Sequence, residues 1–257
     1  SMVPLLFASV SAVITSYFFR DTDVLFNFQL EEAWKVKHLA FYLLLAVATG
    51  IASVYFSKIY FLITKFFSRF KNAYAKIGLA AIAIGLMLYF IPPLYGEGFG
   101  LINNLLNGNT AEAIKGVSFS VDMENVWMVV SILMLIVVFK AIAMTTTFAA
   151  GGVGGVFIPT LFMGSALGNA VAKIINQFGF EVSESNFTLI GMTGLMAGVL
   201  HAPLTAIFLI AEITGGYDLF VPLMLVAAIS YGLTRYFIPN SIYTTELAKR
   251  GELITND

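Results

Sequence analysis

Long apolar stretches without a formally charged residue constrain this chain more than any other feature of its sequence. A helix that crosses a bilayer needs about 20 consecutive apolar residues, and several stretches approach or exceed that length. Two of them are interrupted, one by a run of glycines and one by His201-Ala202-Pro203, which predicts pairs of half-helices that meet inside the membrane. The stretches are Val3–Phe19, Leu39–Ser57, Gly78–Gly96, Val126–Phe139, Ala141–Ala172, Phe187–Ala211 and Leu219–Thr234.

The composition excludes a soluble protein. Hydrophobic residues make up 59% of the chain and charged residues 11%, whereas soluble domains carry about 25% charged residues. A net charge of -1 gives no basic excess for nucleic acid, and the lack of cysteine removes thiolate metal sites; no other cluster predicts a metal site. Lipid permits only helices or closed barrels, and strand-like alternation is missing. We therefore expect an all-α integral membrane protein.

The distribution of charge predicts a multi-pass topology. The segment Lys58–Lys76 holds five basic residues and no acid, and the positive-inside rule places it in the cytoplasm. The acid-rich segments Asp21–Glu32 and Glu97–Glu124 then lie outside, as alternation requires. The tail with Lys249 and Arg250 ends in the cytoplasm.

The glycine-rich segment Gly151–Gly155, followed by Pro159, carries the most chemical information. Glycines let the backbone leave helical geometry, and Pro159 lies just inside the start of the next helix, where a missing N–H costs least. The free amides of Val156 and Phe157, with Gly154 and Gly155 before them, would form an anion site at a helix N-terminus. A packing kink between close helices is the alternative, and composition alone favours it.

Four polar residues in or beside the apolar stretches have more than one interpretation. Glu212 could carry protons or accept backbone N–H groups near the break at Gly215-Gly216, and we favour the structural role. His201 fits a polar helix junction better than a protonatable site, and a hydrolase dyad with Ser165 has no geometric support. Lys140 either extends to the membrane interface or pairs with an acid. Tyr243, taken alone, is typical of an interfacial anchor.

Small residues also recur at helical spacing in the second half of the chain. This pattern predicts close packing between membrane helices. The residues are Gly164, Gly168, Gly191, Gly194 and Gly198.

Several motifs in a fixed order resemble the CLC family of chloride channels and H+/Cl- antiporters, in its C-terminal half. Gly155–Pro159 matches the GxFxP element of that family, and Gly191–Thr214 resembles its "RAPLT…FEMT" segment, with His201 at the first position. Gly96–Ile102 resembles an extracellular glycine-rich loop, and Ser241–Tyr243 resembles the segment with the inner-gate tyrosine.

This resemblance implies a fold and a function. Residues 39–236 would form the second of two inverted repeats, residues 1–38 the last helix of the first repeat with an external loop, and residues 237–257 a closing helix and cytoplasmic tail. Val156 and Phe157 would bind chloride through backbone amides and Tyr243 through its hydroxyl, with chloride as substrate and no cofactor or enzymatic reaction. A homodimer in a bacterial inner membrane would form through helices near Val3–Phe19, Ala202–Thr214 and Leu219–Phe237.

Two family elements are not found in this sequence, the GSGIP serine element and the GxEGP gating glutamate. We therefore expect the chain to lack an N-terminal half and to form no complete pore alone. Channel and antiporter remain undistinguished. Two other hypotheses stay open: an unrelated secondary transporter with broken helices, and a non-transporting half that serves assembly.

Overall fold

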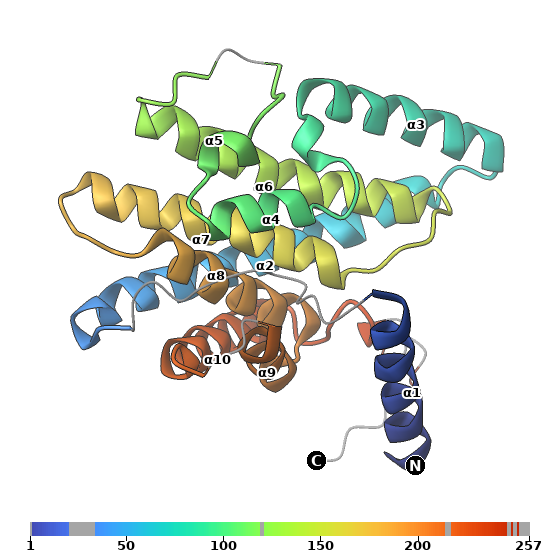
Figure 1. Cartoon of the computed structure of the whole chain (residues 1–257). Helices are drawn as coiled ribbons and strands as arrows, with labels where there is room; N and C mark the ends of the chain where they lie inside the picture. Colours follow the sequence, from blue (N-terminus) through green and yellow to red (C-terminus); the bar gives the residue numbers. More distant parts are fainter. Residues whose placement is uncertain are drawn as a thin grey trace.

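A computed structural model describes residues 2–20, 34–118, 121–213 and 217–245, together with 248 and 251. All regular secondary structure within these residues is helical, and turns and loops connect the helices (Figure 1). The helices are α1 (Met2–Arg20), η1 (Val36–His38), α2 (Leu39–Phe67), α3 (Ala73–Phe90), η2 (Pro92–Leu94), α4 (Phe99–Leu106), α5 (Thr110–Ala113), α6 (Val126–Ala149), α7 (Phe157–Gln177), α8 (Glu184–Leu200), α9 (Pro203–Ile213) and α10 (Phe220–Phe237).

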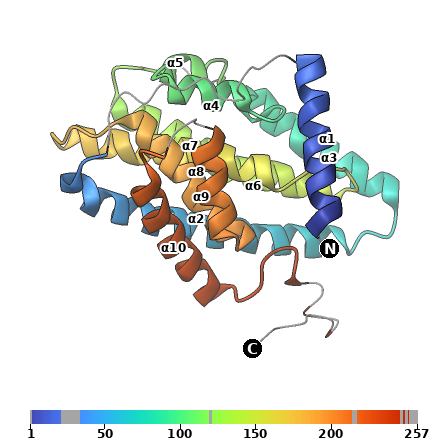
Figure 2. The ribbon, with the colours of Figure 1, turned by 60° about the horizontal axis from the view of Figure 1, so that its bottom comes forward.

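Helices α7 and α8 form the centre of the molecule. Most residues of α7 and nearly all residues of α8 are buried, and α2, α6, α9 and α10 pack around them (Figures 1 and 2). Helix α3 lies on the outside of α6, and α1 stands to one side with its described side chains exposed. Five helices in the described part of the chain are long and apolar enough to cross a membrane: α2 with η1, α3, α6, α7 and α10.

Several helix boundaries differ from those expected. Helix α2 continues past Ser57 to Phe67, so most of the predicted basic loop is helical and only residues 68–72 connect α2 to α3. Helix α3 ends at Phe90 rather than near Gly96, because the two prolines at 92 and 93 cannot continue the helical hydrogen bonds. Helix α6 runs past Lys140 to Ala149, as expected for a helix that continues from Val126 to the glycine-rich segment.

The close packing predicted from small residues is found between α7 and α8. The backbones touch so closely that a Cβ on Gly164 would lie 2.6 Å from the Cα of Met192. A Cβ on Gly168 would collide with the carbonyl oxygen of Phe187, and one on Gly191 with that of Gly164. Contact at this distance fixes the direction of α7, whose N-terminus follows the glycine-rich turn.

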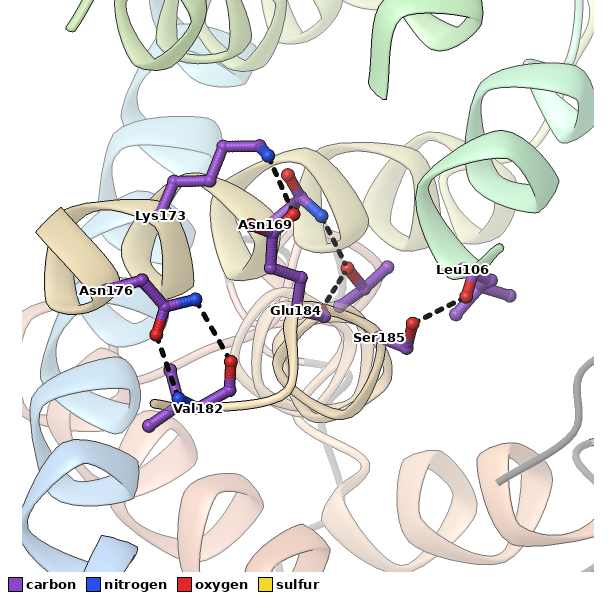
Figure 3. A network of polar contacts seen from close by, with 8 residues as sticks. Leu106, Asn169, Lys173, Asn176, Val182, Glu184 and Ser185 are labelled. Carbon is purple, nitrogen blue, oxygen red and sulfur yellow. Dashed lines mark hydrogen bonds and ion pairs between the residues drawn. The ribbon is translucent and has the colours of Figure 1, made fainter. Parts of the chain in front are cut away.

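Polar contacts fasten the other end of the same helix pair (Figure 3). Lys173 of α7 forms a 2.7 Å ion pair with Glu184 of α8. Nδ2 of Asn176 donates to the carbonyl of Val182, whose own N–H donates to Oδ1 of Asn176 at 2.8 Å. The hydroxyl of Ser185 donates to the carbonyl of Leu106 at 2.6 Å and ties α8 to α4. Helix α7 is thus held along its length.

We predict that Gly168→Ala destabilises the protein by about 1–3 kcal/mol, because the added methyl group forces two rigid backbones apart. Gly85→Ala is the matched control, since nothing lies within 4 Å of the Cβ it would add to α3. Its expected effect is neutral or slightly stabilising. Thermal unfolding in detergent measures both, and equal midpoints for the two variants would contradict the role of Gly168.

Candidate anion site at the start of helix α7

The turn between α6 and α7 ends α6 and leaves the backbone N–H groups ahead of α7 without hydrogen-bond acceptors. Gly151 has a φ of 102°, a left-handed conformation that glycine adopts without strain. Its N–H donates to the carbonyl of Phe148 at 3.0 Å, and the N–H of Gly152 donates to that of Thr147 at 2.9 Å. These two bonds form a Schellman motif, which satisfies the carbonyls of Thr147 and Phe148 in the last turn of α6. The break predicted from the glycines is therefore confirmed.

The residues after this motif have free backbone donors. Helix α7 begins at Phe157, and its first internal bond to the preceding turn runs from the N–H of Thr160 to the carbonyl of Val156 at 3.1 Å. Within the described ranges, the amides of residues 154–158 donate no hydrogen bond. Pro159 has no N–H to lose. The start of α7 thus presents unbonded amides with the positive end of the helix dipole behind them.

A pocket of about 240 Å³ opens beside this turn. Gly154, Gly155 and Pro159 line one side, and Thr147 and Lys140 of α6 line another. The loop that follows α3 supplies Gly96. The side chain of Val156 is buried and that of Phe157 half-buried, so both anchor the helix start in the core. The pocket therefore combines exposed glycine backbone with a lysine.

Lys140 is the chemically unusual residue of this pocket. It is only 5% exposed, yet it donates hydrogen bonds from Nζ to the carbonyls of Leu94 at 3.0 Å and Gly96 at 2.9 Å. The ammonium also lies over the ring of Phe162, 4.3 Å from its centroid, in a cation–π contact. In the part of the chain that the structure describes, no carboxylate pairs with it. Lys140 therefore places a positive charge in the wall of the pocket, with two carbonyls and an aromatic ring as its partners.

The same Phe162 ring receives the loop between α3 and α4. Gly98, the N-cap residue of α4, has a φ of 87°, and a Cβ on it would collide with that ring. Lys140 therefore holds one side of the loop while Phe162 supports the other. This clamp fixes the wall of the pocket that faces α7.

Four of the predicted site residues do not line this pocket: Val156 and Phe157, which lie next to it between Gly155 and Pro159, and Glu212 and Tyr243. Tyr243 follows α10 in a turn, is 59% exposed, and has no described hydrogen bond to α7. Glu212 lies exposed near the end of α9, where the hydroxyl of Tyr217 donates to its Oε2 at 3.5 Å. Gly215 and Gly216, the expected source of backbone donors for Glu212, lie outside the described residues, as do residues 246, 247, 249, 250 and 252–257 of the expected closing helix and tail.

His201 lies at the helix junction, as expected. It ends α8 with a φ of 56°, the one positive φ of a non-glycine residue in the described ranges. Pro203 starts α9 two residues later, and the His201 ring contacts Tyr231 edge-on, with centroids 5.6 Å apart.

Sequence reasoning left the role of Lys140 open and did not connect it to this pocket. One signal was present, since a single lysine inside an otherwise apolar helix usually faces a protein interior or a cavity. Its partners come from a loop more than 40 residues earlier, which no local pattern reveals.

A model of the voltage gated chloride channel family matches residues 1–235. The chain belongs to this family, known as CLC. A ClcB-like chloride channel protein of Ralstonia nicotianae is 28% identical over 96% of this chain and 54% of its own length. The H(+)/Cl(-) exchange transporter ClcA of Vibrio campbellii is 26% identical over 88% of this chain and 46% of its own length.

Two solved structures share the fold of this chain. A slow cyanobacterial Cl-/H+ antiporter superposes with a TM-score of 0.74 at 23% identity, over 96% of this chain and 55% of its own. A CLC-type fluoride/proton antiporter gives 0.68 at 19% identity, over 94% of this chain and 54% of its own. The chain thus spans about half the length of the relatives that it matches.

We predict that Lys140→Met loosens the wall of the pocket, because the carbonyls of Leu94 and Gly96 lose their donor. Amide exchange in residues 91–102 is expected to accelerate about tenfold or more, while α8 is unchanged. Hydrogen-exchange mass spectrometry measures this. Lys115→Met is the control, since Lys115 is exposed and contacts only Glu112, three residues away. Unchanged exchange in Lys140→Met would contradict the clamp.

Proposed function

We propose that this chain forms part of a pathway that moves chloride across a membrane, and that the start of α7 is one of its anion sites. The observation that carries the proposal is the set of unbonded amides at residues 154–158, next to a pocket that also contains buried Lys140. Helix N-termini of this kind bind anions through N–H groups and the helix dipole.

The proposed ligands are the backbone amides of Val156 and Phe157. Gly154 and Gly155 keep the chain unwound ahead of them, and Pro159 begins the helix without requiring a partner for its nitrogen. Partial charges hold an anion less tightly than a salt bridge would, and an ion that must leave again requires such moderate binding. Chloride would be the substrate, with no cofactor and no enzymatic reaction.

Tyr243 is proposed to add its hydroxyl to the same pathway from the segment that follows α10. Its side chain is 59% exposed and free to face an ion or a further part of the protein. Residues 39–236 would form the second inverted repeat, between an N-terminal part at 1–38 and a closing part at 237–257. The remaining half of the anion pathway would come from a first inverted repeat. Glu212 would have a structural role near the end of α9.

A homodimer in a bacterial inner membrane, with the C-terminus in the cytoplasm, completes the proposal. The dimer interface would involve α1, α9 and α10. Exposed apolar side chains on the last two helices support this assignment, among them Leu204, Phe208, Val221 and Met224. The cluster of basic residues from Lys58 to Lys76 supports a cytoplasmic position for the connection between α2 and α3.

Replacement of Phe157 by its α-hydroxy acid tests the anion site, because it exchanges one amide N–H for an ester oxygen and leaves the side chain unchanged. We expect the affinity for chloride to fall about tenfold or more, since a hydrogen bond to an ion is lost. Isothermal titration of the purified chain with chloride measures this. Chloride efflux from liposomes is then measured for the chain alone and for a joined protein, in which the chain is fused to the remaining part of a relative.

The matched control places the same ester at Val126, the first residue of α6, whose amide donates no hydrogen bond within the described ranges and which lies outside the pocket. Chloride affinity is expected to stay within about twofold there. Equal losses at both positions, or none at Phe157, would refute the assignment of the α7 amides.

Tyr243→Phe tests the second proposed ligand by removing only the hydroxyl. We expect chloride efflux by the joined protein to change about fivefold or more, because a donor to the ion is lost. Tyr236→Phe is the control, since Tyr236 is an 82% exposed tyrosine on α10. If both variants transport chloride like the unaltered protein, Tyr243 has no part in the pathway.

A further inference from the structure

A groove between α2 and α10 lies apart from the proposed anion site. Its volume is about 380 Å³, and Figure 2 shows the two helices crossing at this face of the molecule. Five of its six lining residues are apolar, and the sixth is a lysine. The lining residues are Val47, Ile51, Val54, Lys58, Leu233 and Phe237.

The floor of the groove is rigid. Gly50 of α2 lets α10 approach so closely that a Cβ there would lie 2.5 Å from a methyl group of Leu233. The hydroxyl of Thr234, one residue further on, donates to the carbonyl of Gly50 at 3.5 Å and to that of Ser230 at 2.8 Å. The groove is therefore a fixed depression between two packed helices.

Lys58 gives one end of the groove a positive charge. Its side chain is exposed, and it forms no ion pair within the described ranges. It is also the first charged residue after the long apolar stretch that begins at Leu39. In a helix that crosses a membrane, this is the position at which the side chain reaches the headgroup region.

The length of the groove matches one leaflet of a bilayer. Val47, Ile51, Val54 and Lys58 lie on one face of α2, and eleven residues of helix span about 16 Å. Half of a hydrocarbon core is about 15 Å thick. An acyl chain that lies along the apolar residues would therefore bring its headgroup to Lys58.

We propose that this groove binds an anionic glycerophospholipid, with an acyl chain against Ile51, Leu233 and Phe237 and the phosphate at the ammonium of Lys58. The charge complementarity selects an anionic lipid, because a zwitterionic headgroup brings its own cation to the same place. The proposal rests on the membrane location of the protein and not on anion transport, so either can fail without the other.

Native mass spectrometry of the purified full chain, with phosphatidylglycerol or phosphatidylcholine added in matched amounts, tests the charge. We expect the unaltered protein to retain phosphatidylglycerol about fivefold better than phosphatidylcholine, and Lys58→Gln to abolish this preference. Lys65→Gln is the matched control, since Lys65 is an exposed lysine on the same helix outside the groove. Its preference is expected to persist. Equal losses in both variants, or no preference in the unaltered protein, would overturn the proposal.

Ile51→Trp tests the apolar part, because the larger ring fills the groove. We expect retention of both lipids to fall, while Leu62→Trp leaves it unchanged. Leu62 is the control because it lies on the same helix outside the groove and is 64% exposed, close to the 61% of Ile51. Thermal unfolding without added lipid verifies that each variant is folded. Full lipid retention in folded Ile51→Trp would overturn the assignment of the acyl chain.

Discussion

A backbone amide without a partner is costly inside a membrane, and the structure depends on where it allows such amides. Irregular backbone at membrane depth is tolerated when it is enclosed by protein or lines a water-filled cavity. In this chain the unbonded amides follow the turn between α6 and α7 and border a pocket. The Schellman motif satisfies the carbonyls of Thr147 and Phe148 on the α6 side of the same turn. The donors ahead of α7 also have the positive end of the helix dipole behind them, which would favour an anion at this position.

Positioning these donors requires that α7 cannot shift, and this explains why the most tightly packed helix pair begins at the site. Gly164 and Gly168 allow α8 to contact the backbone of α7 directly, and the Lys173–Glu184 ion pair fixes its far end. On the side of the pocket, Lys140 and Phe162 hold the loop after α3. Buried packing and one buried cation therefore act together on a single helix terminus.

Sequence alone predicted the features that depend on local backbone chemistry. The break at Gly151, the junction at His201 and the close approach at Gly168 follow from glycine, proline and small residues whose effects reach only a few positions. The long-range features escaped it. The hydrogen bonds of Lys140 join residues 44 and 46 positions apart. The sequence also did not predict that α2 continues through Lys58 to Phe67. Such contacts depend on how the helices pack in three dimensions.

The full charge of Lys140 and the partial charges of the amides at the start of α7 would hold an ion with different strengths. A bare buried ammonium would hold chloride strongly, since the interaction of full charges is large where the effective dielectric constant is low. Lys140 instead donates hydrogen bonds to two carbonyls and makes a cation–π contact with an aromatic ring. Part of its positive charge is therefore already compensated. In the proposed pathway, its remaining charge would draw an anion toward the pocket, while the amides of Val156 and Phe157 would offer only partial charges. Moderate attraction of this kind would let an ion enter and also leave, as translocation requires.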